Sequence, residues 1–306
     1  MSGNPQLKKL IDDFHRQQPI RAGSLIITVY GDVIAPRGGT VWLGSLISFL
    51  EPLGLSDRLV RTTISRLSKD SWLSATQIGR KSYYSLTDSG RRRFQNATPR
   101  IYAGPLIDWD GSWCLVILPQ HLKQKRDAAR KELGWLGFGT VSSGLMAHPL
   151  PDFPALKQTL ELLDIHEDVI LLTKARHDMT SGRALETLVH ECWDLEELGQ
   201  LYQDFLSRYR PVYHALRKGP LPRDEECALL RILMIHEYRK ILLKDPLLPT
   251  QLLPAHWEGT AAHQLCRNIY RLLLSASEQY FSATLETADG PLPAPGAEFF
   301  RRFGGI

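Results

Sequence analysis

Hydrophobic and polar positions follow a helical period between residues 57 and 69. At about 100° per residue, one side of this helix carries four residues that can pack against a core: Val60, Thr63, Ile64 and Leu67. The opposite side carries six polar or basic residues: Arg58, Arg61, Thr62, Ser65, Arg66 and Lys69. Ser56 is a favourable N-cap, and the acid Asp57 suits the positive end of the helix dipole. The pattern predicts an amphipathic helix whose basic face has acids only at its ends.

Two apolar segments precede this helix, and a β-hairpin follows it. Residues 22–34 and 41–54 are apolar enough to form buried helices. Residues 71–87 are rich in β-branched and aromatic side chains on both sides of the sequence "GRK", which predicts two strands with Arg80 and Lys81 at their tip. Three helices and a basic hairpin form the order of a winged helix-turn-helix, whose third helix can enter the major groove of DNA.

The charge of the chain is distributed unevenly. Residues 1–100 contain 15 basic and 7 acidic side chains and have a net charge of +8, whereas residues 101–306 contain 22 basic and 26 acidic ones and have a net charge of −4. A compact basic module indicates a polyanionic partner, because neutralised phosphates release counterions. Two alternatives are a solvated surface with an excess of arginine and a winged helix that binds protein. DNA is favoured, since the basic face and the basic hairpin tip occur together.

Positions along the third helix divide its polar side chains into two roles. Arg61, Ser65 and Arg66 are assigned to base edges in the major groove. Arg58 and Lys69 lie nearer the helix ends and are assigned to phosphates. The arginine-rich segment 88–100 is either a further backbone contact or a solvated linker helix.

Several separated segments together resemble the PaaX family, repressors of phenylacetic acid degradation operons. They are "SLIITVYGDVIAPRGGTVWLGSLISFLEPLG", "VRTTISRLSKDSWL", "GRKSYYSLTDSG", "RIYAGPLIDWDGSWCLVILP", "GFGTVSSGLMAHP" and "HEYRKILLKDPLLPTQLLPAHWEG", and they span residues 20 to about 270. The resemblance implies a homodimeric repressor that phenylacetyl-CoA releases from its operator, the dimer also matching the two-fold symmetry of inverted-repeat operators. One departure is Ser71 in "KDSWL", where the family usually has glycine before the tryptophan.

The rest of the chain predicts an α+β protein with two further folded parts. Strands and helices alternate over residues 113–176, which fits a ferredoxin-like βαββαβ unit independently of the family. Long amphipathic helices follow over 193–216, 223–243 and 260–285. The predicted organisation is a winged-helix DNA-binding domain at 1–98, a ferredoxin-like domain at 99–180, an all-helical domain at 181–290 and a mobile tail at 291–306.

Composition excludes several other classes. The chain has 306 residues, 43% of them hydrophobic and 23% charged, as in a soluble globular protein. It contains no apolar run of about eighteen residues, and its N-terminus lacks the features of a secretory signal, so we expect a cytoplasmic protein without a membrane partner. The four cysteines are far apart in sequence and are interpreted as buried thiols.

No sequence motif indicates catalysis. "HECWD" and "HEYRK" begin like a zinc-protease helix, but Asp194 and Lys240 stand where the second histidine is needed. "GFGTVS" lacks the third glycine of a dinucleotide loop. We therefore expect no catalytic residue, metal or cofactor. The alternative function is an enzyme, either a metal-dependent nuclease or one acting on acyl-CoA, and a third class is a protein-interaction scaffold.

An acyl-CoA effector needs cations for its phosphates and an apolar or aromatic wall for its acyl group. The segment 236–257 contains both the cations and an aromatic side chain. Its predicted effector-binding residues are His236, Arg239, Lys240 and Trp257. The alternative is structural: Arg239 and Asp245 fasten the proline-rich loop to its helix, and Trp257 belongs to the core.

Overall fold

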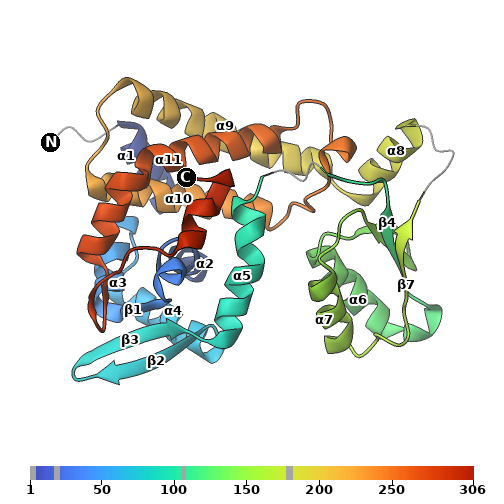
Figure 1. Cartoon of the computed structure of the whole chain (residues 1–306), viewed down its shortest axis with the longest axis horizontal. Helices are drawn as coiled ribbons and strands as arrows, with labels where there is room; N and C mark the ends of the chain where they lie inside the picture. The colour runs from blue at the N-terminus through green and yellow to red at the C-terminus, as the bar shows by residue number, and fades with distance from the viewer. Residues whose placement is uncertain (1–4, 17–20, 105–107, 177–181) are drawn as a thin grey trace. The chain divides into compact units, whose positions relative to one another are not determined.

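The computed structural model describes residues 5–16, 21–104, 108–176 and 182–306 (Figure 1). The chain has a mixed α+β fold and forms two compact units. Unit 1 consists of residues 1–104, 205–239 and 262–306, and unit 2 consists of residues 105–204 and 240–261. The helices that the sequence assigned to one domain at 181–290 are therefore divided between the two units.

Unit 1 begins with helices packed around an apolar core. They are α1 (Pro5–Arg16), α2 (Ala22–Val29), α3 (Leu43–Leu50) and α4 (Asp57–Lys69). After α2 the helix widens into a π-helical turn, Tyr30–Ile34, and tightens into a 3₁₀ turn, Ala35–Arg37. The predicted helix over 22–34 is thus confirmed, as an α-helix that continues into a π-helical turn. π-helical turns within helices are frequent at functional sites.

A three-stranded antiparallel sheet follows the helices. Strands β1 (Thr40–Trp42), β2 (Leu73–Ile78) and β3 (Lys81–Leu86) have the order β1-β3-β2. The prediction of a helix beginning at Val41 was wrong for β1, because Thr40 to Trp42 pair with Ser85 to Tyr83 of β3. The predicted hairpin is confirmed, with Ile78 opposite Lys81 and Gly79 at φ +59° in its turn. Helix α5 (Asp88–Tyr102) continues from the hairpin (Figure 1).

Unit 1 is completed by helices from the C-terminal third of the chain. These are the second part of α9 (Leu195–Lys218), most of α10 (Asp224–Leu242) and most of α11 (Glu258–Thr284). A single buried cluster joins Leu25 and Ile64 of the first helices to Ile232 of α10 and Phe281 of α11. Because they share one core, the N-terminal helices and these C-terminal segments stabilise each other.

The C-terminal segment of the chain packs within unit 1. It forms a short hairpin, β8 (Glu286–Thr287) and β9 (Gly290–Pro291), and a 3₁₀ segment, η6 (Ala297–Gly304). Phe299 is 3% exposed, Arg302 5% and Phe303 2%. The predicted mobile tail at 291–306 is therefore corrected: Phe299, Arg302 and Phe303 are buried in unit 1, while Phe300 and Arg301 are exposed.

Unit 2 contains the predicted alternation of strands and helices. Its elements are β4 (Trp113–Ile117), α6 (Gln124–Trp135), β5 (Gly139–Ser142), β6 (Leu145–His148), α7 (Phe153–Leu162), β7 (Ile170–Ala175) and α8 (Gly182–Cys192). The sheet is antiparallel with the order β5-β6-β4-β7. Val116 of β4, Leu133 of α6 and Leu160 of α7 share its core. No helix within the described ranges is long and apolar enough to cross a membrane.

Candidate nucleic-acid interface

Helix α4 has the predicted amphipathic arrangement. The Ser56 hydroxyl oxygen accepts a hydrogen bond from the amide of Leu59 at 3.3 Å and caps the first turn. The four residues of the predicted stripe are buried: Val60, Thr63, Ile64 and Leu67. Burial of this stripe fixes the rotation of α4, and the opposite face is directed to solvent.

All six predicted side chains on that face are exposed: Arg58, Arg61, Thr62, Ser65, Arg66 and Lys69. Two of them already have local partners. Arg61 Nε lies 2.7 Å from a carboxylate oxygen of Asp57, and the Thr62 hydroxyl donates to the carbonyl of Arg58 at 2.8 Å. An exposed ion pair of this spacing contributes only about 0.3 to 0.5 kcal/mol. A phosphate or base edge can therefore displace Asp57 from Arg61 at small cost.

A groove lies between α4 and the start of α2. It has a volume of about 480 Å³, and Arg21, Thr62 and Arg66 are among its lining residues. Arg66 lies against the start of α2, since a Cβ at Gly23 would be 2.9 Å from Arg66 Nη2. Sequence reasoning missed Arg21, although its position directly before an apolar helix was a usable signal.

The hairpin presents its two predicted cations differently. Arg80 lies exposed in the turn. Lys81 is half-buried, forms an ion pair with Glu286 and lies 4.1 Å from the centre of the Trp42 ring. The hydrogen bond to Glu286 raises the pKa of Lys81, so this lysine stays protonated while much of its charge is matched within the protein. Arg80 is thus the more available of the two.

The turn from α4 into the hairpin explains the departure at Ser71. This residue has φ +58°, a conformation that favours glycine. Its carbonyl accepts a hydrogen bond from the Thr87 hydroxyl at 2.6 Å, and the hydroxyl oxygen of Thr87 also caps α5 by accepting from Gly90 N at 2.9 Å. Serine therefore keeps the turn that glycine would make, and Thr87 fastens the turn to α5.

A buried ionic network joins distant parts of unit 1. Asp32 accepts hydrogen bonds from Arg231 at 2.8 Å, Arg302 at 2.9 Å, Tyr102 at 2.6 Å and Tyr270 at 2.9 Å. Burial by itself would raise the pKa of Asp32, but the two guanidinium groups and the two hydroxyl donors lower it below its ordinary value. Asp32 is therefore a charged residue inside the core, and it holds α5, α10, α11 and η6 together.

Comparisons with known proteins match three consecutive parts of the chain. Family models match three consecutive segments: the PaaX-like protein at residues 21–90, the PaaX protein central Cas2-like domain at 107–186 and the PaaX-like protein C-terminal domain at 193–283. The transcriptional repressor PaaX of Escherichia coli (strain K12) is 40% identical over 289 residues, which cover 94% of this chain and 92% of that protein. The chain belongs to the PaaX family.

A solved structure has a related fold. The uncharacterized protein Rv0674 from Mycobacterium tuberculosis is similar to this PaaX-family chain with a TM-score of 0.50 and 21% identity, covering 77% of this chain and 89% of that one. At this identity the likeness concerns the fold alone.

The predicted effector residues of this PaaX-family protein lie in different surroundings. In unit 1, His236 Nδ1 is 3.1 Å from the Thr28 hydroxyl, and Arg239 donates to the Ser24 hydroxyl oxygen at 3.2 Å. Burial lowers the pKa of Arg239 below its ordinary value. Both side chains thus fasten α10 to α2.

The other two predicted effector residues belong to unit 2. Lys240 is exposed, and Trp257 is half-buried with its ring 5.9 Å from that of Tyr202. The Tyr202 hydroxyl donates to Asp245 at 2.5 Å, and Asp245 also accepts from Leu247 N at 2.7 Å. The interpretation of Trp257 as a packing residue is supported by this aromatic contact.

In the described part of the chain the potential metal ligands are dispersed, and most of the cysteines are buried. Among the residues that the structure describes, no three His, Cys, Asp or Glu side chains gather as a metal site. Cys114, Cys227 and Cys266 are buried free thiols and Cys192 is half-buried, so the interpretation of buried thiols holds for three of the four. Burial raises the pKa of Cys114 to about 11, which leaves it protonated and unreactive.

Proposed function

We propose that this protein is a transcriptional repressor that binds operator DNA through a winged helix-turn-helix made of α2, α3, α4 and the β2–β3 hairpin. The exposed basic face of α4 is the single observation that carries the proposal. The E. coli relative, a transcriptional repressor, supports it.

In this proposal α4 enters the major groove. Arg61, Ser65 and Arg66 contact base edges, since they occupy the middle of the exposed face. The flanking side chains contact phosphates, together with the hairpin tip: Arg58, Thr62, Lys69, Arg80 and Lys81. Such a repressor acts in the cytoplasm, where its operator is.

The regulated process and the effector come from the family resemblance. We propose control of phenylacetate degradation genes, with release from the operator by phenylacetyl-CoA. Contacts from His236, Arg239, Lys240 and Trp257 to that effector stay a prediction. The βαββαβ order of unit 2 and its match to a Cas2-like family model support a ferredoxin-like middle domain.

A homodimer completes the proposal, and strand β7 is the surface that supports it. β7 is the last strand of its sheet, and its outer edge pairs with no strand in the described part of the chain. Ile170 is 54% exposed, Leu171 38% and Leu172 44%. Antiparallel pairing of two copies about Leu171 would place Asp168 of each opposite Lys174 of the other, so the edge is complementary to itself in charge.

The test is binding of the full chain to fragments of its own promoter region, measured by fluorescence anisotropy as the salt concentration is varied. We expect Arg66→Ala to weaken specific binding by about 1 to 3 kcal/mol, and Lys131→Ala, an exposed lysine on α6, to leave binding unchanged. The proposal would be refuted if the wild-type protein did not bind promoter DNA at low salt. Turnover of nucleic acid or of acyl-CoA would favour the enzyme instead.

A further inference from the structure

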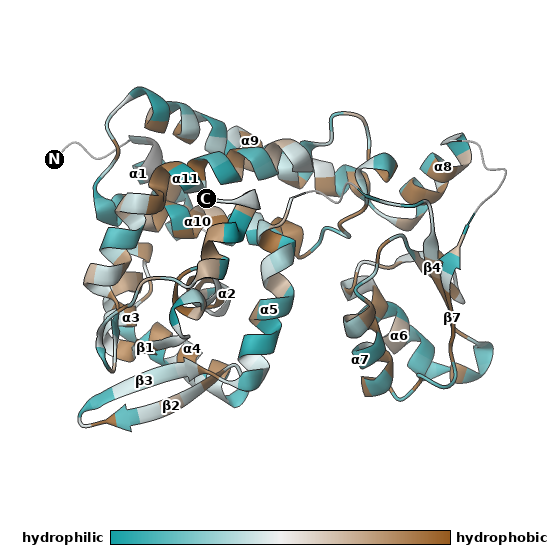
Figure 2. Ribbon diagram, viewed as in Figure 1, coloured by the Kyte–Doolittle hydropathy of each residue, from teal (hydrophilic) through white to brown (hydrophobic). Residues whose placement is uncertain are grey.

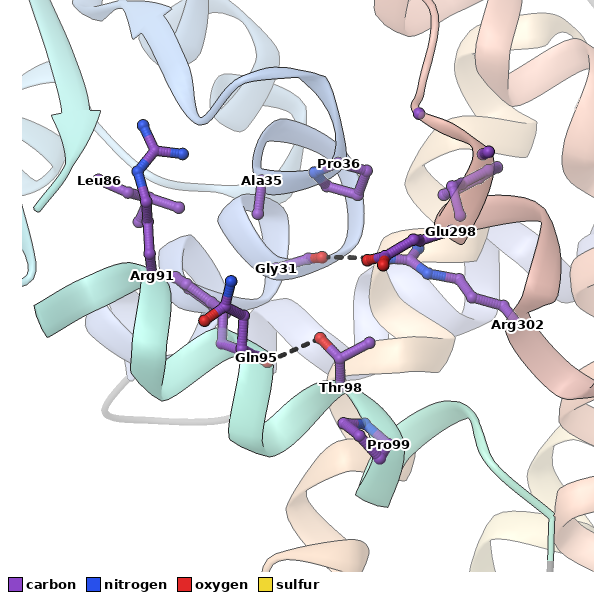
Figure 3. A pocket seen from close by; sticks show the side chains of 14 residues that line it. Gly31, Ala35, Pro36, Leu86, Arg91, Gln95, Thr98, Pro99, Glu298 and Arg302 are labelled. Carbon is purple, nitrogen blue, oxygen red and sulfur yellow. Dashed lines mark hydrogen bonds between the residues drawn. The ribbon is translucent and has the colours of Figure 1, made fainter. Parts of the chain in front are cut away.

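A pocket of about 630 Å³ lies within unit 1 between α5, the helical turn after α2, and the C-terminal segment (Figure 3). This volume lies within the range of about 300 to 1,000 Å³ typical of small-molecule sites. The pocket is built from three parts of the chain that are far apart in sequence, and no sequence motif pointed to it.

Most of the pocket wall is apolar. The side chains of Ala35, Pro36, Leu86, Phe94 and Phe299 contribute to it. Phe94 and Phe299 are 9% and 3% exposed, so a small part of each aromatic side chain faces the pocket. Such a wall suits an aromatic group, because ring contacts add to the gain from apolar burial.

Polar groups are concentrated on α5, which Figure 2 shows as largely hydrophilic. Gln95 is exposed at the pocket and has an amide N–H able to donate to a carbonyl oxygen. Arg91 is exposed, and its guanidinium donates to the carbonyl of Gly38 at 3.2 Å, which holds it beside the pocket. Arg91 forms no ion pair within the described residues, so it can take an anionic group.

Arg302, by contrast, belongs to the floor of the pocket. Its guanidinium donates to the Asp32 carboxylate, to the Tyr270 hydroxyl oxygen and to the carbonyl of Gly31. These partners use its donors and match its charge. Figure 3 shows Glu298 on the side of Arg302 and Arg91 on the other side, so an anion is directed towards Arg91.

We propose that this pocket binds the effector of the repressor, an aryl-acyl thioester of coenzyme A. The aryl group lies against Phe94 and Phe299, Gln95 donates to the thioester carbonyl, and Arg91 contacts a phosphate of the CoA outside the pocket. The assignment rests on the proposed function for the class of ligand. It differs from the sequence prediction at His236, Arg239, Lys240 and Trp257.

The position of the pocket connects occupancy to DNA binding. Leu86 ends hairpin strand β3, and Arg91 lies in the helix that continues from the hairpin. Phe299 and Arg302 belong to η6, which the Asp32 network holds in the core. A ligand between α5 and η6 contacts both sides at once. It therefore favours one relative position of hairpin and core, and a position that fits the operator poorly lowers DNA affinity.

The test compares release from the operator for four full-length proteins. Thr98→Trp fills the pocket from α5, and Ala255→Trp fills a second cavity, of about 760 Å³ in unit 2, as the matched control. Lys240→Ala removes a residue of the rival site. Operator affinity without effector is measured first, and phenylacetyl-CoA is then titrated into each complex.

We expect Thr98→Trp to bind the operator and to need at least about tenfold more phenylacetyl-CoA for release, while Ala255→Trp and Lys240→Ala respond like the wild type. If phenylacetyl-CoA does not release the wild-type protein from the operator, the proposed effector is wrong, and so is the proposed occupant of the pocket. If phenylacetyl-CoA releases the wild type and Thr98→Trp equally well, the pocket assignment alone is wrong. Loss of response in Lys240→Ala only would assign the site to the rival residues.

A second measurement applies if Thr98→Trp does not fold. Thr98→Cys is labelled with N-ethylmaleimide, and each modified cysteine is quantified by mass spectrometry. Phenylacetyl-CoA should slow labelling at position 98 and leave the half-buried Cys192 of unit 2 unchanged as the internal reference. Equal labelling at position 98 with and without phenylacetyl-CoA would overturn the pocket.

Discussion

Arg231 of α10 donates a hydrogen bond to the carboxylate of Asp32 at 2.8 Å, across 199 residues of sequence, and both side chains are fully buried. Arg231 also donates to Glu278 at 2.7 Å and to the Tyr270 hydroxyl oxygen. The pair connects the helical segment after α2, at the edge of the proposed DNA-binding part, to the C-terminal helices. Separation of these two parts of unit 1 would leave unpaired charges in its apolar core, which is energetically costly.

Replacing Arg231 should strongly destabilise unit 1. Arg231→Met leaves Asp32 with fewer partners in a buried site, and the expected loss is about 3 to 5 kcal/mol in the free energy of unfolding. Urea denaturation followed by circular dichroism measures it. Asp164→Asn, which removes an exposed pair with Lys125 in unit 2, is the control and should change stability little. Equal effects of the two changes would contradict a structural role for the network.

Removing Asp57 should release Arg61 for DNA. Asp57→Asn breaks the 2.7 Å ion pair, so contact of Arg61 with a base edge no longer requires displacement of Asp57, and specific operator binding measured by fluorescence anisotropy should strengthen by about 0.3 to 0.5 kcal/mol. The change also removes an acid from the first turn of α4, which costs about 0.3 to 1 kcal/mol of helix stability. Asp88→Asn removes the corresponding acid of α5 and serves as the control. Unchanged operator affinity in Asp57→Asn would show that Arg61 does not contact the operator.

The two cations of the hairpin tip should differ in their effect on DNA binding. Arg80→Ala should weaken binding to all sequences and lower the salt slope by about one. Lys81→Ala should change the slope less, because Glu286 already matches its charge. Anisotropy titrations at several salt concentrations measure both slopes. A larger effect of Lys81→Ala would mean that DNA displaces Glu286 from the lysine.

His263 should make unit 1 less stable in mild acid. Burial, and then the nearby Arg267, lower its pKa from 6.5 to about 4. Between pH 6.5 and about pH 4, His263 is protonated in the unfolded chain but neutral in the folded protein. The free energy of unfolding therefore falls as the pH decreases. We expect about 1 kcal/mol to be lost from this residue between pH 7.5 and pH 5.5. His263→Gln should show a correspondingly weaker pH dependence in urea denaturation, and an identical pH dependence would refute the assignment.

The edge of β7 should control the oligomeric state. Ile170→Asp with Leu172→Asp should give a monomer in light scattering coupled to size exclusion, since carboxylates replace exposed apolar side chains at the edge. Leu162→Asp, at a site that is 79% exposed on α7, is the control. Asp168→Lys and Lys174→Asp should each weaken the dimer, and their combination should restore it. A dimer that survives the double change at Ile170 and Leu172 places the interface elsewhere.

Local sequence patterns predicted some features of the site and missed others. The face of α4 was predictable because its helical period needs only neighbouring residues. The amphipathic helix α1 was overlooked, and the strand at Thr40–Trp42 was taken for a helix, because its pairing with β3 is a non-local contact. Asp32 had a usable signal, an acid inside an otherwise apolar helix, which indicates a buried partner but not which one.

By itself, the sequence determined the β2–β3 hairpin, the alternation of strands and helices in unit 2, the stripe that buries one side of α4 and the basic charge of the first hundred residues. These properties follow from the spacing of side chains along a regular backbone. The tertiary structure alone decided which charges remain available, because the partners come from distant segments. Glu286 covers Lys81, and Arg302 reaches Asp32 across 270 residues to fix a segment expected to be a mobile tail. No periodic pattern encodes such contacts, which depend on the shared core that brings both ends of the chain together.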